Sequence, residues 1–134
     1  MIKITANINE LNKVVEAIKK IDKRIILLRG NLASGKTTLV KAFVKSLGIK
    51  ENVTSPTFSI QQIYDDRVFH YDIYNKELKN FLALGLFEEF EKEGWHMVEW
   101  GSDELKAFLE GVGYNVVTIN IEPNGNARTY RIIR

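Results

Sequence analysis

The sequence predicts a three-layer α/β fold, in which helices cover both faces of a mixed, mostly parallel central sheet. A continuous apolar run at residues 25–28 is typical of a strand buried on both faces, and a glycine-rich loop and a helical pattern follow it. Strand and helix patterns then alternate along the chain, as expected of an α/β domain. Near the C-terminus, two alternating segments flank Asn124-Gly125, which is a strong signal for an antiparallel hairpin.

Each expected element follows from a local pattern. Short apolar runs and apolar–polar alternation predict strands at residues 2–6, 25–28, 59–64, 68–72, 96–100, 114–122 and 128–133. Helical periodicity and capping residues predict helices at 9–21, 36–47, within 76–93, and from 102 to 109. Asn9 and Ser102 are the expected N-caps, and Gly48 is expected to end the second helix. A type I′ turn is expected at Asn124-Gly125, because such hairpins favour Asn-Gly.

Composition limits the possible classes of protein. The chain has 134 residues, of which 45% are hydrophobic and 27% charged, and this profile fits one domain over residues 1–134. The absence of cysteine excludes disulfides, thiolate zinc sites, iron–sulfur clusters and a cysteine nucleophile. The N-terminus shows no signal-peptide pattern, and the longest apolar run has four residues, too few to span a membrane. We therefore expect a cytoplasmic protein.

Charge is unevenly distributed along the chain. Residues 1–50 hold 11 Lys and Arg against 3 Asp and Glu, whereas residues 51–104 hold 4 against 12. The difference fits either solvated helix faces or a bipolar surface that docks onto partners. The sequence has no Lys/Arg-rich run of the kind that binds nucleic acid by itself.

A phosphate-binding motif follows the buried strand. Gly30-x-x-x-x-Gly35-Lys36-Thr37 is a P-loop pattern, which makes the predicted fold P-loop NTPase-like. The glycines allow the backbone N–H groups to surround a phosphate, and the start of the helix adds positive potential. Lys36 is expected at the β- and γ-phosphates and Thr37 at Mg²⁺. The expected nucleotide contacts are Asn31, Leu32, Ala33, Ser34, Gly35, Lys36, Thr37 and Thr38.

Two acidic residues end predicted strands. Asp72 closes the strand at 68–72, and Glu99 follows the apolar residues at 97–98. Carboxylates at the C-terminal ends of parallel strands face the ligand crevice of an open α/β sheet. We expect one of them to hold Mg²⁺, directly or through water, and the other to orient the attacking water; either can take either role.

The nucleotide is expected to be ATP. GTPases recognise their base with Asn/Thr-Lys-x-Asp, and the nearest string here, Asn75-Lys76-Glu77-Leu78, lacks the aspartate. A small-molecule kinase usually carries an arginine-bearing lid, but Arg67 is the only arginine between Thr38 and Trp100.

Four motifs in order carry a resemblance to a known family. They are Gly30-Asn31-Leu32-Ala33-Ser34-Gly35-Lys36-Thr37-Thr38, Ser55-Pro56-Thr57-Phe58, His70-Tyr71-Asp72-Ile73-Tyr74 and Glu99-Trp100. Together they resemble the TsaE (YjeE) family from about Ile25 to Trp100, and Leu84-Gly85-Leu86 also matches its pattern.

The resemblance implies a small Mg²⁺-dependent ATPase that works with TsaB- and TsaD-type subunits. That machinery forms threonylcarbamoyladenosine beside the tRNA anticodon, so tRNA is an indirect partner. We expect turnover to be slow without these subunits, because the chain has no arginine between Arg67 and Arg128 to neutralise the transition state. The resemblance places Thr37 and Glu99 at Mg²⁺, with Asp72 in or next to that shell. It implies a switch-like loop at residues 55–57, where Thr57 senses the γ-phosphate, and it favours a nucleotide or partner contact for Trp100.

The chain departs from the family pattern at a few positions. Asn31 replaces an aspartate beside the phosphates, Ala33 and Ser34 replace a glycine and an alanine, and Asn75 replaces an arginine. A phosphate or partner contact made by that arginine in the family therefore does not carry over to this chain on the resemblance.

Several other side chains admit two interpretations. Trp100 is either a nucleotide contact or a core residue, and His70 either orients Asp72 or is structural. His96 is expected to be structural. The tyrosines are expected in the core or crevice rather than stacked on RNA bases: Tyr64, Tyr71 and Tyr74. The arginines of the last strand either touch phosphate or tRNA or protect a sheet edge: Arg128, Arg131 and Arg134.

Two functional alternatives to the ATPase subunit stay open. One is a nucleotide-gated binding module without significant turnover, and the other is a small-molecule kinase. Phosphate release, phosphate transfer and dependence on partners distinguish the three.

Overall fold

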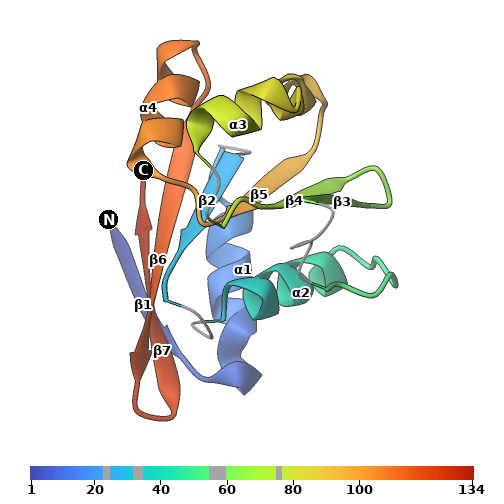
Figure 1. The fold of residues 1–134 in the computed structure, drawn as a ribbon. Helices are drawn as coiled ribbons and strands as arrows, with labels where there is room; N and C mark the ends of the chain where they lie inside the picture. The colour runs from blue at the N-terminus through green and yellow to red at the C-terminus, as the bar shows by residue number, and fades with distance from the viewer. Residues whose placement is uncertain (23–24, 32–34, 55–59, 75–76) are drawn as a thin grey trace.

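The computed structural model describes residues 1–22, 25–31, 35–54, 60–74 and 77–134. The described strands form one seven-stranded sheet in the order β1-β7-β6-β2-β5-β4-β3 (Figure 1). The strands are β1 Ile2–Ala6, β2 Ile25–Arg29, β3 Gln61–Tyr64, β4 Val68–Asp72, β5 Trp95–Glu99, β6 Val116–Asn124 and β7 Ala127–Ile133. The α-helices are α1 Leu11–Lys19, α2 Lys36–Ser46, α3 Leu78–Ala83 and α4 Asp103–Gly111, with 3-10 segments η1 Ile8–Glu10 and η2 Leu86–Glu91.

The middle of the sheet is parallel and its two edges are antiparallel. β6, β2, β5 and β4 pair in parallel, whereas β3 pairs with β4, β6 with β7, and β7 with β1 in antiparallel register. The predicted mixed sheet with an antiparallel C-terminal hairpin is therefore confirmed.

Helices cover both faces of this sheet (Figure 1). Ile26 and Leu28 of β2 pack into the core that α1 and α2 share with the sheet. Ile25 and Leu27, which point the other way, belong to the core beneath α3, η2 and α4. All four side chains are at most 4% exposed, as the unbroken apolar run predicted. The three-layer prediction is confirmed.

The structure corrects three local expectations. The first helical segment is capped by Asn7 rather than Asn9: the Asn7 side chain accepts from the Asn9 N–H, and Glu10 accepts from the Asn7 N–H. This capping box satisfies two N–H groups at the start of the segment. The region within 76–93 divides into α3 and η2, because Gly85 takes a left-handed φ of 75° between them.

The third correction concerns the C-terminal hairpin. Asn124 pairs with Ala127, so the two central residues of the turn are Gly125 and Asn126. Only Gly125 has a positive φ, at 62°. A type I′ turn at Asn124-Gly125 is therefore wrong, because that turn needs positive φ at both central residues.

Other boundaries agree with expectation. Ser102 caps α4 by accepting from the Leu105 N–H at 3.0 Å, and Gly48 follows α2 with a φ of 79°. No helix within the described residues has the length and apolar character needed to cross a membrane.

Candidate functional site

The phosphate loop connects β2 to α2. Gly35 is the N-cap residue of α2 and has a φ of 102°, a left-handed conformation that glycine adopts without the steric cost of a side chain. Lys36 and Thr37 then form the first turn of α2. Leu32, Ala33 and Ser34 lie outside the described residues, as do Thr57 and the rest of the predicted switch-like loop at 55–57.

Parallel register brings both predicted acids to this loop. Glu99 of β5 pairs with Leu28 of β2 on one side and with Asp72 of β4 on the other. The two carboxylates therefore lie on neighbouring strands, at the same edge of the sheet as the phosphate loop. They are 3% and 6% exposed, and burial at this depth demands polar partners.

Glu99 has two such partners. Its Oε2 accepts a hydrogen bond from Thr37 Oγ1 at 2.8 Å and lies 2.5 Å from Nε2 of His70. The interpretation that His70 orients Asp72 is thus wrong, because its Nε2 reaches the neighbouring strand and meets Glu99 instead. The contact joins the predicted Mg²⁺ residue of α2 to the predicted acid of β5.

Lys36 lies beneath this edge and is only 5% exposed. Its Nζ donates to the carbonyl of Gly30 at 2.7 Å and to that of Asn31 at 3.1 Å, and it lies 3.9 Å from the centre of the Trp100 ring. Burial lowers the Lys36 pKa, while the negative charges of Glu99 and Asp72 oppose that shift. The ammonium group is thus held by its own loop, close to two carboxylates.

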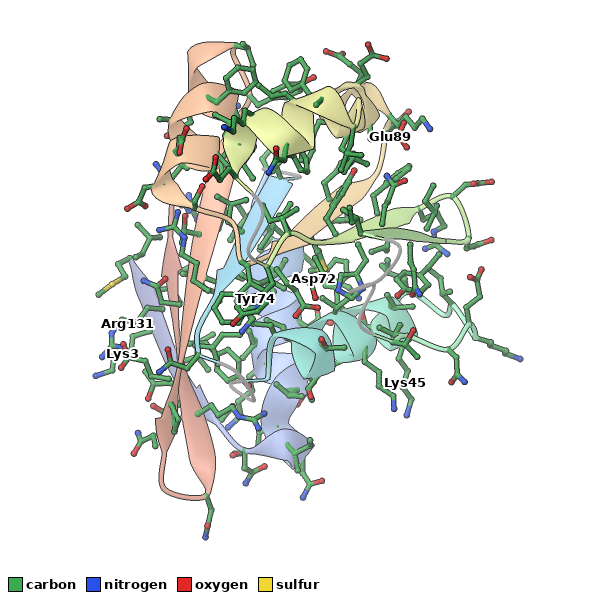
Figure 2. All side chains as sticks on the ribbon, viewed as in Figure 1. Lys3, Lys45, Asp72, Tyr74, Glu89 and Arg131 are labelled. Carbon is green, nitrogen blue, oxygen red and sulfur yellow. The ribbon has the colours of Figure 1, made fainter. Side chains whose placement is uncertain are left out.

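Trp100 and Tyr74 form an aromatic pair beside Lys36. Their ring centres are 4.7 Å apart, and Asp72 Oδ1 accepts from the Tyr74 N–H at 3.0 Å. Figure 2 shows Asp72 and Tyr74 at the centre of the molecule, near the approach of β2, β4 and α2. Trp100 is partly exposed and has a φ of 66°, which costs a bulky residue about 1–2 kcal/mol. The backbone N–H of Trp100 donates to the carbonyl oxygen of Leu28 at 3.1 Å, and this bond anchors the strained residue.

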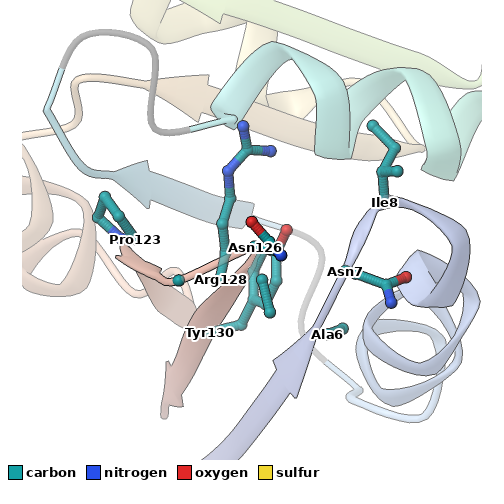
Figure 3. Close-up of a pocket in the computed structure, with 9 residues that line it drawn as sticks. Ala6, Asn7, Ile8, Pro123, Asn126, Arg128 and Tyr130 are labelled. Carbon is teal, nitrogen blue, oxygen red and sulfur yellow. The ribbon is translucent and has the colours of Figure 1, made fainter.

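The C-terminal hairpin adds a cation that sequence reasoning left undecided. A Cβ atom added to Gly35 would lie 2.8 Å from Cζ of Arg128, so the guanidinium occupies the space that the missing side chain leaves. Figure 3 shows Arg128 extending from the hairpin toward the start of α2. Since β6 runs parallel to β2, the hairpin turn emerges at the same edge as the phosphate loop. This position depends on strand order and register, so no local sequence pattern could have placed Arg128.

One cavity lies beside Arg128, and another borders the phosphate loop. The first, of about 240 Å³, lies between the end of β1 and the hairpin, and its lining includes Asn7, Ile8, Asn126, Arg128 and Tyr130 (Figure 3). The second, of about 420 Å³, borders Gly30, Asn31 and Trp100 and extends to the start of α4. Thr38, at the expected α-phosphate position, is partly exposed in the first turn of α2.

The oxygen atoms that the side chains offer at this edge suit Mg²⁺, which needs few protein ligands, better than a metal ion that protein side chains alone would enclose. Within the described ranges, no three His, Cys, Asp or Glu side chains gather as a metal site. Mg²⁺ in nucleotide sites typically takes one or two protein oxygens and completes its shell with water and phosphate. Thr37 Oγ1 and the carboxylates of Glu99 and Asp72 supply oxygens of this kind.

Comparisons with known proteins agree with this arrangement. The family model described as "Threonylcarbamoyl adenosine biosynthesis protein TsaE" matches residues 5–131. A tRNA threonylcarbamoyladenosine biosynthesis protein TsaE of Treponema pallidum is 39% identical over 99 residues, which are 69% of this chain and 73% of that protein. The TsaE of Bacillus subtilis is 43% identical over 79 residues, 57% of this chain and about half, 49%, of its own length.

A solved structure supports the fold as well. The crystal structure of Bacillus subtilis YdiB superimposes with a TM-score of 0.67 at 27% identity, and the match covers 96% of this chain and 82% of that one. The predicted P-loop NTPase-like fold is confirmed. The chain belongs to the TsaE family and is a nucleotide-binding P-loop protein of tRNA threonylcarbamoyladenosine biosynthesis.

Proposed function

We propose that this chain binds and hydrolyses Mg²⁺-ATP in support of TsaB- and TsaD-type subunits, which form threonylcarbamoyladenosine beside the tRNA anticodon. The observation that carries the proposal is the hydrogen bond between Thr37 Oγ1 and Glu99 Oε2, 2.8 Å long. It joins the P-loop hydroxyl to a buried carboxylate of the neighbouring strand, the pair of groups that P-loop NTPases use at their metal.

Phosphate binding uses the loop and Lys36. The backbone N–H groups at the start of α2 and the helix dipole favour the negative phosphates. Lys36 Nζ exchanges its bonds to the Gly30 and Asn31 carbonyls for bonds to the β- and γ-phosphate oxygens. This exchange is favourable because a charge-assisted bond to phosphate is stronger than a bond to a neutral carbonyl.

Thr37 and one of the two carboxylates, Glu99 or Asp72, would hold Mg²⁺, which when bound neutralises charge on the phosphates. One carboxylate is then the metal ligand, and the other accepts a hydrogen bond from the attacking water and orients it. Their adjacent register positions allow this division of labour.

The nucleoside extends to the opposite flank of β2. Glu99 lies on the β5 side of β2, so the terminal phosphate is expected there, while the hairpin follows β6 on the other side. The cavity lined by Asn7 and Asn126 offers amide groups to a base, and Arg128 reaches from it toward Gly35. We therefore assign Arg128 to the α- and β-phosphates and this cavity to the adenosine.

Three measurements test the proposal. The protein is mixed with radiolabelled ATP and Mg²⁺, with and without TsaB- and TsaD-type subunits and, separately, with a set of candidate metabolites, and binding, phosphate release and phosphate transfer are followed. We expect binding, and phosphate release that rises with the partners. Binding without release under either condition would favour a nucleotide-gated module, and label transferred to a metabolite would favour a kinase.

A further inference from the structure

A buried hydrogen-bond chain links Glu99 to strand β3. Nε2 of His70 lies 2.5 Å from Glu99 Oε2, and Nδ1 of the same ring lies 3.1 Å from the Tyr64 hydroxyl. His70 is fully buried, and Tyr64 is 2% exposed. The imidazole therefore bridges β5 and β3 from its position on β4.

Glu99 points to the direction of its own bond with His70. A carboxylate oxygen that already accepts from Thr37 Oγ1 calls for a second donor, so we assign the proton of this contact to Nε2 of His70. Thr37 donates to the same oxygen, Oε2. No hydrogen bond from the described residues reaches Oε1, so this oxygen is the one left for a ligand.

Tyr64 holds the far side of the imidazole. Its hydroxyl lies 2.7 Å from Gln62 Oε1 and 3.4 Å from the carbonyl of Thr54, besides the 3.1 Å to Nδ1 of His70. Burial raises the Tyr64 pKa to about 12, so the hydroxyl keeps its proton at neutral pH. Gln62 in turn donates to Thr54 Oγ1 at 3.2 Å, which extends the network to the segment that follows α2.

We propose that His70 is a positioning residue that holds the Glu99 carboxylate by Oε2 and leaves Oε1 directed at the metal and phosphates. The role rests on the proposed ATPase function. Thr37 Oγ1 is itself an expected Mg²⁺ ligand, so its bond to Glu99 changes when the nucleotide binds. Nε2 of His70 is not an expected metal ligand, so its bond to Glu99 persists through the cycle of ATP binding and hydrolysis.

The other histidine of the chain provides a matched control. His96 is also buried beside a tyrosine, with Nδ1 2.7 Å from the Tyr71 hydroxyl and Nε2 2.8 Å from the Lys92 carbonyl. Its neighbours in the core lie on the opposite face of the sheet, under α3, η2 and α4. A change at His96 therefore reports what the loss of a buried histidine does without touching Glu99.

The first test reads the protonated nitrogen directly, without nucleotide. Because the chain has only two histidines, long-range ¹H–¹⁵N spectra can be assigned by comparing the wild type with His96→Gln. We expect Nε2 of His70 to be protonated. An unprotonated Nε2 would overturn the positioning role, whatever the protein does with ATP.

The second test replaces His70 by glutamine or asparagine, whose side-chain amides take the places of different nitrogens of the imidazole ring. In His70→Gln the amide nitrogen can reach the place of Nε2, whereas in His70→Asn it reaches only the place of Nδ1. With partner subunits present, His70→Asn should lower kcat at least about tenfold, since it loses a bond to a charged group. KM should change less than about threefold, and His70→Gln and His96→Gln should retain most of the wild-type kcat.

A binding readout accompanies the kinetics. The ratio of nucleotide Kd in EDTA to that in Mg²⁺ should fall in His70→Asn and stay near the wild-type value in His70→Gln. Equal kcat and equal Kd ratios in the Asn and Gln variants would refute the inference.

If His70→Asn fails to fold, Tyr64→Phe replaces it. This variant loses one neutral hydrogen bond (roughly 0.5–1.5 kcal/mol), so kcat should fall two- to tenfold. An unchanged kcat in Tyr64→Phe would refute the positioning role. A wild-type protein without ATP binding or turnover would instead contradict the proposed function.

Discussion

The Lys36 ammonium group is buried, bound to two carbonyls of its own loop and stacked on an aromatic ring. Burial lowers the pKa of Lys36, and the negative charges of nearby Glu99 and Asp72 oppose this shift. These contacts hold the ammonium group at the start of α2, where the proposed function expects the phosphates. The two hydrogen bonds of Nζ go to neutral carbonyls, so a phosphate, which accepts stronger charge-assisted bonds, can replace them.

Lys36→Ala should therefore weaken ATP binding at least about tenfold while the fold survives, since a charge-assisted hydrogen bond contributes about 1.5–3 kcal/mol. Titration with a fluorescent ATP analogue and a thermal melt measure the two effects. Lys45→Ala, at an exposed lysine of the same helix, is the control and should bind normally. A folded Lys36→Ala protein with wild-type affinity would defeat the P-loop assignment.

Glu99→Gln removes a charge with almost no change of shape. We expect the variant to retain ATP and to turn it over at least about tenfold more slowly, because a weaker metal ligand or water acceptor raises the barrier by about 1.4 kcal/mol or more. Glu89→Gln, on the opposite layer and paired with Lys92, controls for the general loss of a carboxylate. Unchanged turnover in Glu99→Gln would assign the acidic role to Asp72 alone.

His96 connects stability to pH. Burial lowers its pKa from the ordinary 6.5, with smaller opposing contributions from the Lys92 carbonyl and Glu89. Below about pH 6.5 the unfolded chain therefore binds a proton that the folded chain resists, and stability is lost as pH falls. Thermal melts between pH 8 and 5 should show this decline, and His96→Gln should flatten it. Equal slopes in both proteins would contradict the assignment.

Among the secondary-structure elements, the hairpin β6–β7 makes the contribution to the site that was hardest to predict from the sequence. β2 with its P-loop was predictable, because a short apolar run followed by Gly-x-x-x-x-Gly-Lys-Thr is local information. The convergence of Asp72 and Glu99 was also predictable, from the rule that parallel strands end at one edge. The position of Arg128 against Gly35 and the bond from His70 to Glu99 depend on strand order and register, which local patterns do not encode.

Arg128→Gln tests the contribution of the hairpin. The proposed bond from the guanidinium to phosphate is charge-assisted, so its loss should weaken ATP binding about tenfold or more and affect adenosine less. Arg131→Gln is the matched control, because Arg131 lies on the same strand and pairs with Glu122 at 2.8 Å. Equal ATP affinities in the two variants would remove Arg128 from the proposed nucleotide site.

Across the whole molecule, part of the uneven charge of the sequence falls on opposite faces of the sheet. The exposed lysines of α1 and α2 lie on one side of the sheet: Lys13, Lys41 and Lys45. The exposed glutamates in and after η2 belong to the opposite layer: Glu88, Glu91 and Glu93. Surfaces of opposite sign favour association with complementary subunits and orient the encounter.

Turnover by the isolated chain is expected to be slow and to rise when partner subunits bind. Because the proposal assigns Arg128 to the α- and β-phosphates, we do not expect Arg128 to supply a cation at the terminal phosphate, which is expected on the Glu99 side of β2. An arginine supplied at that position raises kcat roughly 10³-fold or more in P-loop enzymes. Association through exposed charges should weaken with salt, since such charges are screened beyond about 8 Å at physiological ionic strength. Steady-state ATPase activity, measured alone and with TsaB- and TsaD-type subunits across a salt series, should show stimulation that fades as salt rises. Fast turnover by the chain alone, indifferent to those subunits, would instead indicate a self-sufficient ATPase or kinase.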